Sequence, residues 1–174
     1  RLQATATANG VTATSWLVDT QTMAASPDGV ADGGVKLVEL RGVEAAFPFY
    51  GRLELEGGLT YSHALLVNRG AVVQPELLAA LNIRVGDAFR MAGELYRVTG
   101  VISRDRTQRG GIAFGPRVYV DLADLRRSVL LGFGSRATHQ MLMRLDDAEK
   151  TEAATSALRA VGQNEFLNVR SWKT

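Results

Sequence analysis

The sequence of 174 residues contains no cysteine. Disulfide bonds, thiolate catalysis and cysteine-based zinc sites are therefore excluded. Cysteine-free chains occur in oxidising and in reducing compartments, so this absence leaves the compartment open. Histidine is almost as scarce, because His63 and His139 are the only two. Neither lies in a metal-ligand motif such as H-E-x-x-H, and no EF-hand loop is present.

Long apolar runs and an excess of one charge are also missing. No run approaches the ~18–20 residues that a membrane-spanning helix needs. The formal net charge of +2 gives no reason to expect a nucleic-acid partner. With 46% hydrophobic and 22% charged residues, the composition is that of a soluble globular domain or of two closely packed subdomains. The chain begins at Arg1 rather than at Met, which we interpret as a fragment cut from a longer protein.

Alternating and β-branched segments predict strands, and periodic segments with end signals predict helices. Pro75 at the first helical position and Asn82 at the left-handed cap frame one helix. Two alternating runs around Ala92-Gly93-Glu94 predict a β-hairpin. We expect strands at 5–18, 35–40, 52–56, 71–73, 117–120, 139–145 and 166–169, the hairpin at 83–102, helices at 75–81, 121–126 and 146–161, and a helical turn at 21–25.

Side chains able to carry chemistry form no recognisable catalytic set. Ser62, His139 and an aspartate make a triad on paper, but no G-x-S-x-G nucleophile elbow is present. A hydrolase would require the Ser62 hydroxyl within hydrogen-bond distance of a histidine. Residues 110–115 lack the Lys-Ser/Thr pair of a phosphate-binding loop, and Asp146-Asp147 fits the acidic first turn of a helix. We therefore predict no catalytic, cofactor-binding or metal-binding residue.

Two groups of side chains are candidates for contact with a partner or ligand. The basic group could meet phosphates or lipid headgroups, although a solvated hairpin loop is the preferred explanation. The aromatic group could line a partner groove, although core or hinge packing is the simpler and preferred explanation. The two groups are Arg104, Arg106 and Arg109, and Phe47, Phe49 and Tyr50.

Three phrases along the chain carry a family resemblance. The segment 35–50, VKLVELRGVEAAFPFY, followed by GRL, resembles the "GFPFYGEL" region of MacB/FtsX-like permeases, particularly the YbbP-like group. The segment 71–97, AVVQPELLAALNIRVGDAFRMAGELYR, is similar to the family's P-x-LLA-x-L and VGD passage. FGPRV at 114–118, followed by VDLADL at 120–125, resembles its F-x-PRV and DL passage.

The resemblance implies an α+β fold with two parts. A discontinuous α/β porter-like layer would be formed by both chain ends, residues 1–50 and 136–174. An inserted β-rich subdomain would occupy residues 51–135. The residue patterns agree, since the chain ends as strand–helix–strand and its middle is rich in short strands.

The resemblance also implies a function without chemistry of its own. Such a domain lies on the periplasmic side of the bacterial inner membrane, between the first two transmembrane helices of a multi-pass ABC-transporter permease. Its expected partners are those helices, an ABC ATPase subunit, a second copy of the transporter chain and a periplasmic accessory protein. ATP would be used by a separate cytoplasmic subunit or domain, and no cofactor is expected here. The domain would couple helix movement to export or to envelope lipid and lipoprotein handling.

One consequence of this interpretation, and one alternative to it, can be compared with a structure. If both ends lead into membrane helices, the N- and C-terminal strands should lie in one layer of the domain and point to the same side. The alternative function is a periplasmic small-ligand or lipid-binding module, in which Phe47, Phe49, Tyr50 and Phe114 would line an apolar cleft.

Overall fold

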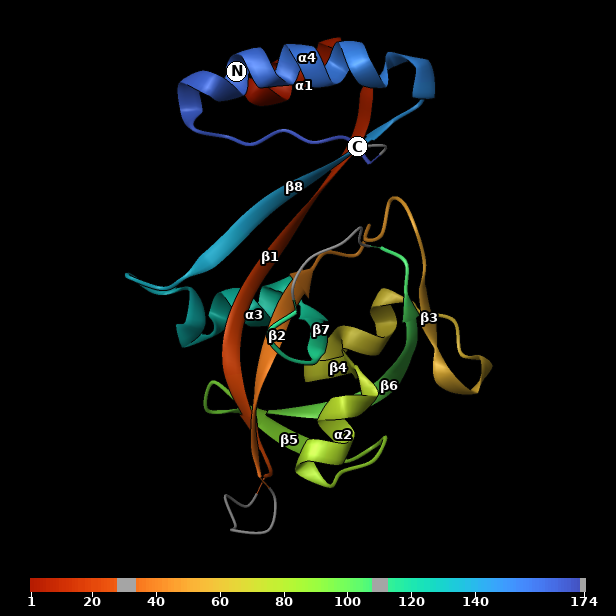
Figure 1. Ribbon diagram of the computed structural model, residues 1–174, viewed down its shortest axis with the longest axis vertical. Helices are drawn as coiled ribbons and strands as arrows, with labels where there is room; N and C mark the ends of the chain where they lie inside the picture. Colours follow the sequence, from red (N-terminus) through yellow and green to blue (C-terminus); the bar gives the residue numbers. More distant parts are fainter. Residues whose placement is uncertain (28–33, 108–112, 173–174) are drawn as a thin grey trace. The chain divides into compact units, whose positions relative to one another are not determined.

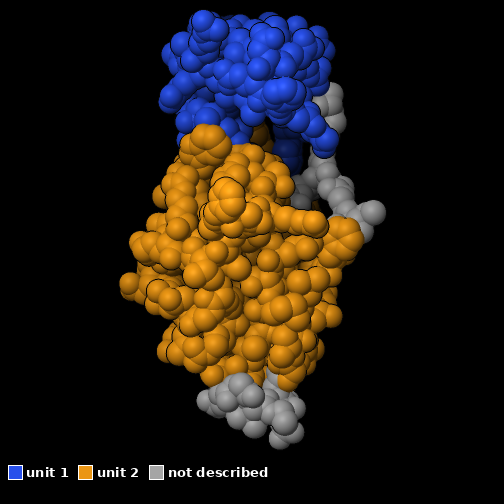
Figure 2. Space-filling view, turned by 90° about the vertical axis from the view of Figure 1, so that its left-hand side faces the viewer, with its two compact units in different colours: residues 1–15, 141–174 blue, residues 16–140 orange. Residues whose placement is uncertain are grey.

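A computed structural model describes residues 1–27, 34–107 and 113–172. The chain divides into two compact units, one made of residues 1–15 with 141–174 and the other of residues 16–140. Figure 2 shows the two units in separate colours. Unit 1 therefore combines the two chain ends, and unit 2 is one continuous stretch. The helices and strands of the chain, with a sheet of parallel and antiparallel pairs, confirm the α+β class expected from the sequence.

Eight strands form the sheet system. Short helices and 3₁₀ turns connect them (Figure 1). The strands are β1 Val11–Ala25, β2 Val35–Val43, β3 Leu53–Leu55, β4 Gly70–Val73, β5 Ala88–Met91, β6 Glu94–Asp105, β7 Arg117–Asp121 and β8 Ala137–Leu145. The α-helices are α1 Leu2–Ala8, α2 Pro75–Leu81, α3 Leu122–Arg127 and α4 Thr151–Gly162. The 3₁₀ turns are η1 Glu56–Gly58, η2 His63–Arg69, η3 Val129–Leu131, η4 Ala148–Lys150 and η5 Gln163–Glu165.

Unit 2 is built on a ring of strands in the order β1, β2, β7, β4, β6, β5 and back to β1. The β2–β7 and β4–β6 pairs are parallel, and the other pairs in the ring are antiparallel. Because β1 pairs with β2 along one edge and with β5 along the other, the ring closes into a small barrel. The last strand, β8, pairs with β1 outside this ring, and β3 pairs with β6.

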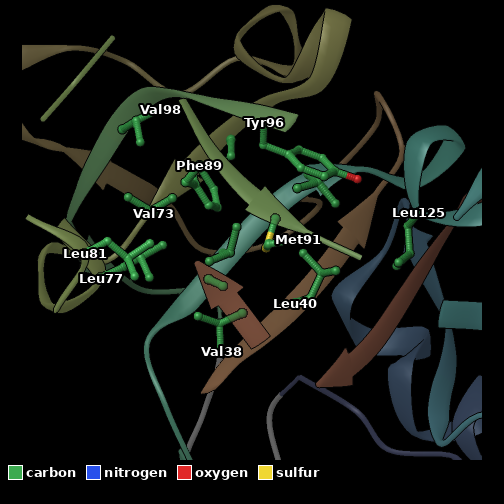
Figure 3. Packing of buried hydrophobic residues seen from close by; sticks show 14 of the residues in the cluster. Val38, Leu40, Val73, Leu77, Leu81, Phe89, Met91, Tyr96, Val98 and Leu125 are labelled. Atoms are coloured by element: carbon green, nitrogen blue, oxygen red, sulfur yellow. The ribbon is translucent and has the colours of Figure 1, made fainter. Parts of the chain in front are cut away.

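The barrel encloses one hydrophobic core to which all six ring strands contribute. Two helices add side chains to it, Leu77 and Leu81 from α2 and Leu122 and Leu125 from α3. Figure 3 shows how these apolar side chains converge between the strands. The buried members of the cluster are Val18, Ala24, Val38, Leu40, Ala71, Val73, Leu77, Leu81, Phe89, Met91, Tyr96, Val98, Val118, Val120, Leu122 and Leu125.

Unit 1 has a much smaller core. Ala6 of α1, Val11 of β1 and Leu158 of α4 are its buried members. Side chains at its margin include Met143 and Leu145 of β8. Within this unit the hydroxyl of Thr12 donates to the carbonyl oxygen of Arg144 at 3.3 Å, so β1 and β8 are also joined through a side chain. Helices α1 and α4 therefore pack with the start of β1 and the end of β8.

Three local predictions are wrong. The alanine-rich residues 2–8 form α1 instead of contributing to a strand, because burial of Ala6 against Leu158 favours a helix there. Residues 21–25 continue β1 instead of forming a helical turn, since β2 pairs along their whole length. Residues 166–169 form no strand: Phe166 has a left-handed φ of 55°, and the amide of Leu167 donates to Gly162 at 2.9 Å.

The subdomain boundaries expected at 50/51 and 135/136 stay a prediction. The compact units have their boundaries at 15/16 and 140/141, inside β1 and inside β8. The long antiparallel pairing of β1 with β2 explains why residues 16–50 group with unit 2.

Candidate functional site: a polar network around β1, β2 and β7

The predicted aromatic contact residues occupy different environments. Phe47 is only 5% exposed, and its ring lies 6.2 Å from that of Tyr61 and 5.7 Å from that of Tyr119. Phe47 therefore packs inside unit 2, as the packing interpretation of the sequence expected. Phe49 is half-buried and Tyr50 is exposed. Their contact with a partner or ligand stays a prediction.

Phe114, proposed with these residues as the lining of a cleft, is 68% exposed. Its amide donates to the Glu39 carboxylate at 2.9 Å, which holds the segment beside β2. A buried Phe47 and a solvent-facing Phe114 do not share one lined surface. The geometry of these two residues therefore gives little support to the small-ligand alternative.

The predicted basic group is only partly described. Arg104 is exposed on β6, and the Arg106 Nε lies 3.3 Å from the Glu54 carboxylate in an exposed ion pair. Arg109 lies outside the described residues. Because Glu54 offsets the charge of Arg106, the described part of this group is a weaker anion site than the sequence suggested.

The residues of the hypothetical triad are in different places. His139 is exposed on β8, whereas the His63 Nε2 is buried 3.5 Å from the Asp121 carboxylate. Asp121 already accepts from the Ala123 amide at 3.1 Å and caps α3, as predicted. No hydrogen bond between the Ser62 hydroxyl and either histidine occurs in residues 1–27, 34–107 and 113–172. The arrangement that a serine hydrolase requires is therefore not formed in this part of the chain.

A different set of polar side chains is concentrated where β1, β2 and β8 meet in unit 2. Arg41 of β2 donates to both oxygens of Asp19 of β1, at 2.6 and 2.8 Å. The side-chain amide of Gln140 of β8 donates to the same Asp19 carboxylate at 2.9 Å. One residue further, the hydroxyl of Thr20 donates to the carbonyl oxygen of Arg136 at 2.8 Å. One carboxylate thus joins three strands.

This ion pair is partly shielded from solvent. The Arg41 side chain is 8% exposed, and that of Asp19 is 30% exposed. Burial by itself lowers the pKa of Arg41, but the hydrogen bonds and charge of Asp19 outweigh it and the pKa is raised. Arg41 therefore remains charged, and its fixed fork of donors holds the carboxylate in a bidentate geometry.

The network continues to β7, which pairs with β2, and to β6. The guanidinium of Arg41 lies over the ring of Tyr119 of β7, 5.9 Å from its centre. The Tyr119 hydroxyl donates to Asp105 of β6 at 2.5 Å, and Arg117 lies 3.6 Å from the same carboxylate. Arg117 also pairs with Glu39 of β2 at 2.9 Å. Polar contacts therefore run from β8 through β1, β2 and β7 to β6.

Burial is the main reason why the pKa of Tyr119 is raised to about 12. The nearby Arg41 guanidinium opposes this shift, and the Asp105 carboxylate adds to it. Tyr119 is thus a neutral donor at physiological pH. We call the set Asp19, Arg41, Gln140, Tyr119, Asp105, Arg117 and Glu39 the strand network.

None of the strand-network residues was singled out from the sequence. The available signal was Arg41, a charged residue between Leu40 and Gly42-Val43 in the strand segment 35–43, because a charge buried in a strand requires a partner. The identity of that partner depends on strand pairing, since Asp19 precedes Arg41 by 22 positions. Chemically, the network contains acceptors, donors and two arginines, and its geometry fixes strands in place.

Among the residues that the structure describes, no group of three or more acidic or histidine side chains is placed to hold a metal ion. Within the same residues, every helix is too short or too polar to cross a membrane.

Comparison with known proteins gives consistent results. The family model of the MacB-like periplasmic core domain matches residues 3–161. The extracellular domain of the non-canonical ABC-type transporter YknZ from Gram-positive bacteria is similar, with a TM-score of 0.63, 14% identity, and coverage of 97% of this chain and 83% of that one. The periplasmic region of MacB from Actinobacillus actinomycetemcomitans has a TM-score of 0.56 and 14% identity, over 94% of this chain and 74% of that one. No curated protein matches this sequence.

Proposed function

Because the chain belongs to the MacB-like periplasmic core domain family, we propose that it couples ATP-driven helix movement in an ABC-transporter permease to export or to envelope lipid and lipoprotein handling. In this proposal membrane helices of the same parent chain adjoin both ends of the domain. An ABC ATPase subunit or domain on the cytoplasmic side uses the ATP. The parent is a multi-pass protein of the inner membrane, acts as a dimer and works with a periplasmic accessory protein.

The observation that carries the proposal is the course of the chain. Both ends belong to unit 1, and the chain passes between the units at 15/16 and at 140/141. Both passages lie within strands, β1 and β8, rather than within loops. A strand is fixed by its ladder of hydrogen bonds, so a displacement applied at one of its ends moves the other end as well.

The strand network supports the same proposal within unit 2. Gln140 and Asp19 join β8 to β1, and Arg41 joins Asp19 to β2. The Asp19 carboxylate therefore joins both strands that leave unit 2 to each other and to β2 of the barrel. Movement of β1 and β8 would be passed to the barrel as a rigid-body shift.

The test is to make β1 and β8 flexible at the two points where the chain passes between the units, in the full transporter. Gly-Gly-Ser is inserted between Ser15 and Trp16 and between Gln140 and Met141. A spin label on Ser103→Cys, exposed on β6, is paired with a label in the membrane part, and their distance is measured with and without trapped ATP. We expect an ATP-dependent distance change in the parent and at least a halving of that change after insertion.

The matched control places the same insertion between Gly57 and Gly58. Both glycines have positive φ values, 72° and 71°, and a side chain at either would meet no atom within 4 Å. This control should keep the full distance change. An unchanged distance in the parent, or a change that survives insertion at the passages, would overturn the proposal.

A further inference from the structure

The segment between α3 and β8, residues 128–136, presents apolar side chains to solvent. Phe133 is fully exposed and Val129 is 78% exposed. Burial of exposed apolar side chains against a partner favours association, because it removes their surface from water. Figure 1 shows the segment on the outside of the barrel, next to α3. We call residues 128–136 the Phe133 loop.

The Phe133 loop is anchored at both ends. The Ser128 hydroxyl donates to the Leu125 carbonyl oxygen at 2.6 Å and accepts from the Leu130 amide at 3.2 Å. Leu130 and Leu131 pack against the barrel core, so the loop divides its apolar residues between the core and solvent. At its other end the Arg136 carbonyl oxygen accepts from Thr20. Because this anchoring precedes any binding, little ordering entropy would be lost when Phe133 and Val129 become buried.

Arginines flank the exposed apolar side chains. Arg126 and Arg127 precede the loop, and both are exposed. The Arg136 side chain has no ion pair within the described part of the chain, and it too is exposed. An apolar centre with guanidinium groups at its margin is complementary to an apolar groove that carries carboxylates at its rim.

The charges also discriminate between kinds of partner. Two copies of this chain that met at their Phe133 loops would place arginines opposite arginines, which is repulsive. Arg127 is paired with the buried Asp124, and Arg126 lies 4.0 Å from Glu44. These carboxylates reduce the net positive field, which weakens attraction to an anionic bilayer. A guanidinium can still form directed hydrogen bonds with a carboxylate on a protein.

We propose that the Phe133 loop is a docking site for a separate protein, which receives Phe133 and Val129 in an apolar groove rimmed by carboxylates. The site deepens the proposed function by naming a contact surface for its accessory partner. It is independent of whether helix movement reaches unit 2. Its failure would leave the coupling proposal standing, and the reverse is also true.

The experiment replaces Phe133 with the photoreactive residue p-benzoylphenylalanine in the full transporter, in cells that contain its native partners. Ultraviolet light should join position 133 to a separate protein, and mass spectrometry should identify a cross-linked peptide with apolar residues flanked by Asp or Glu. Combining the probe with Arg136→Glu should lower the adduct yield at least five-fold. The matched control is Arg84→Glu, a charge reversal at an exposed arginine after α2, which should leave the yield unchanged.

Folding of the variants is checked by thermal unfolding of the isolated chain, where Arg136→Glu and Arg84→Glu should keep the parent midpoint. An adduct with phospholipid would assign the loop to the membrane surface and overturn the proposal. So would an adduct with a second copy of the chain, an adduct whose yield is insensitive to Arg136→Glu, or no adduct at all.

Discussion

At the scale of single residues, the structure depends on a few polar side chains placed among apolar ones. Arg41 is the clearest case, because a buried guanidinium is tolerated only with a carboxylate beside it. Tyr119 is a second case of a buried polar group that needs a partner. Its ring is buried against Phe47, and its hydroxyl donates to Asp105. These residues determine which strands are attached to which.

Removal of the Asp19 carboxylate should therefore be costly. In Asp19→Ala, Arg41 keeps its charge but loses its bidentate partner, and we expect the free energy of unfolding to fall by about 3 kcal/mol. Chemical denaturation of the isolated chain measures this. The comparison variant is Glu54→Ala, which removes the exposed partner of Arg106 and should cost less than about 1 kcal/mol. Equal losses in the two variants would contradict the assigned role of Asp19.

Tyr119 should make stability depend on alkaline pH. Its pKa is raised to about 12 in the folded chain, above the usual value of about 10. The unfolded chain therefore releases this proton first, so the stabilisation is fully present below pH 10 and is lost as the pH rises toward 12. Denaturation midpoints measured between pH 9 and pH 11 should fall with increasing pH.

In Tyr119→Phe, the fall across that pH range should be smaller, although some decrease should remain. Tyr61 and Tyr96 contribute to the remainder, because burial raises the pKa of each hydroxyl. An identical pH dependence in Tyr119→Phe and the parent would show that the Tyr119 hydroxyl is not buried as described.

At the scale of elements, local sequence signals determine where a helix begins and ends, and tertiary packing determines where it lies. Helix α2 carries its own start and stop, with Pro75 at the first position and Asn82 in the left-handed conformation, φ 51° and ψ 50°. Helix α3 also carries its own cap, Asp121. Its position against β2, however, requires a residue without a side chain at Gly42.

The cap of α2 can be tested with one pair of substitutions. Asn82→Gly should leave the free energy of unfolding unchanged or slightly increased, since glycine adopts the left-handed region without strain. Asn82→Ala should lower it by about 1 kcal/mol, because a Cβ is disfavoured there. Thermal denaturation of the two variants side by side measures the difference. If the alanine variant is as stable as the glycine variant, Asn82 is not a left-handed cap.

Gly42 is needed for space rather than for its backbone angles. A Cβ at this position would lie 2.8 Å from a methyl carbon of Leu125 and 3.2 Å from the Cα of Leu122. We expect Gly42→Ala to push α3 away from β2 and to cost about 1–3 kcal/mol. Ser103→Ala, at an exposed position of β6, serves as the control and should be neutral. Urea denaturation would contradict the close packing if Gly42→Ala were also neutral.

At the scale of the whole molecule, the two units differ in how much core they possess. The barrel core lies entirely in unit 2, whereas the cluster described for unit 1 has three buried members, Ala6, Val11 and Leu158. Small domains with little buried apolar area are marginally stable by themselves. Unit 1 is also assembled from two segments that are distant in sequence, so its formation costs additional loop-closure entropy.

Residues 16–140 expressed alone should therefore fold cooperatively. The remaining segments, 1–15 joined to 141–174 by a glycine-serine linker, should not. Circular dichroism during heating distinguishes a sigmoidal transition from a gradual change. A cooperative transition in the joined segments, or its absence in residues 16–140, would contradict the assignment of the core to unit 2.

The elements with strong local signals were predictable from the sequence. The alternation in VKLVEL identifies β2, the Gly-containing turn identifies the β5–β6 hairpin, and Asp121 identifies the start of α3. Where local signals are weak, tertiary pairing decides. Residues 21–25 extend β1 because β2 lies beside them, and the segment after Phe166 is held against α4 rather than in a sheet.

For the candidate site too, some properties were predictable from the sequence and others were not. Composition and residue order were enough to indicate the class of the fold, the lack of a recognisable catalytic motif and the resemblance to the family. The shared role of Asp19 toward Arg41 and Gln140 depends on the folded chain, since strand pairing brings these residues together across 22 and 121 positions. Solvent exposure is likewise a tertiary property: the packing of Leu130 and Leu131 onto the barrel core is what leaves Val129 and Phe133 outside.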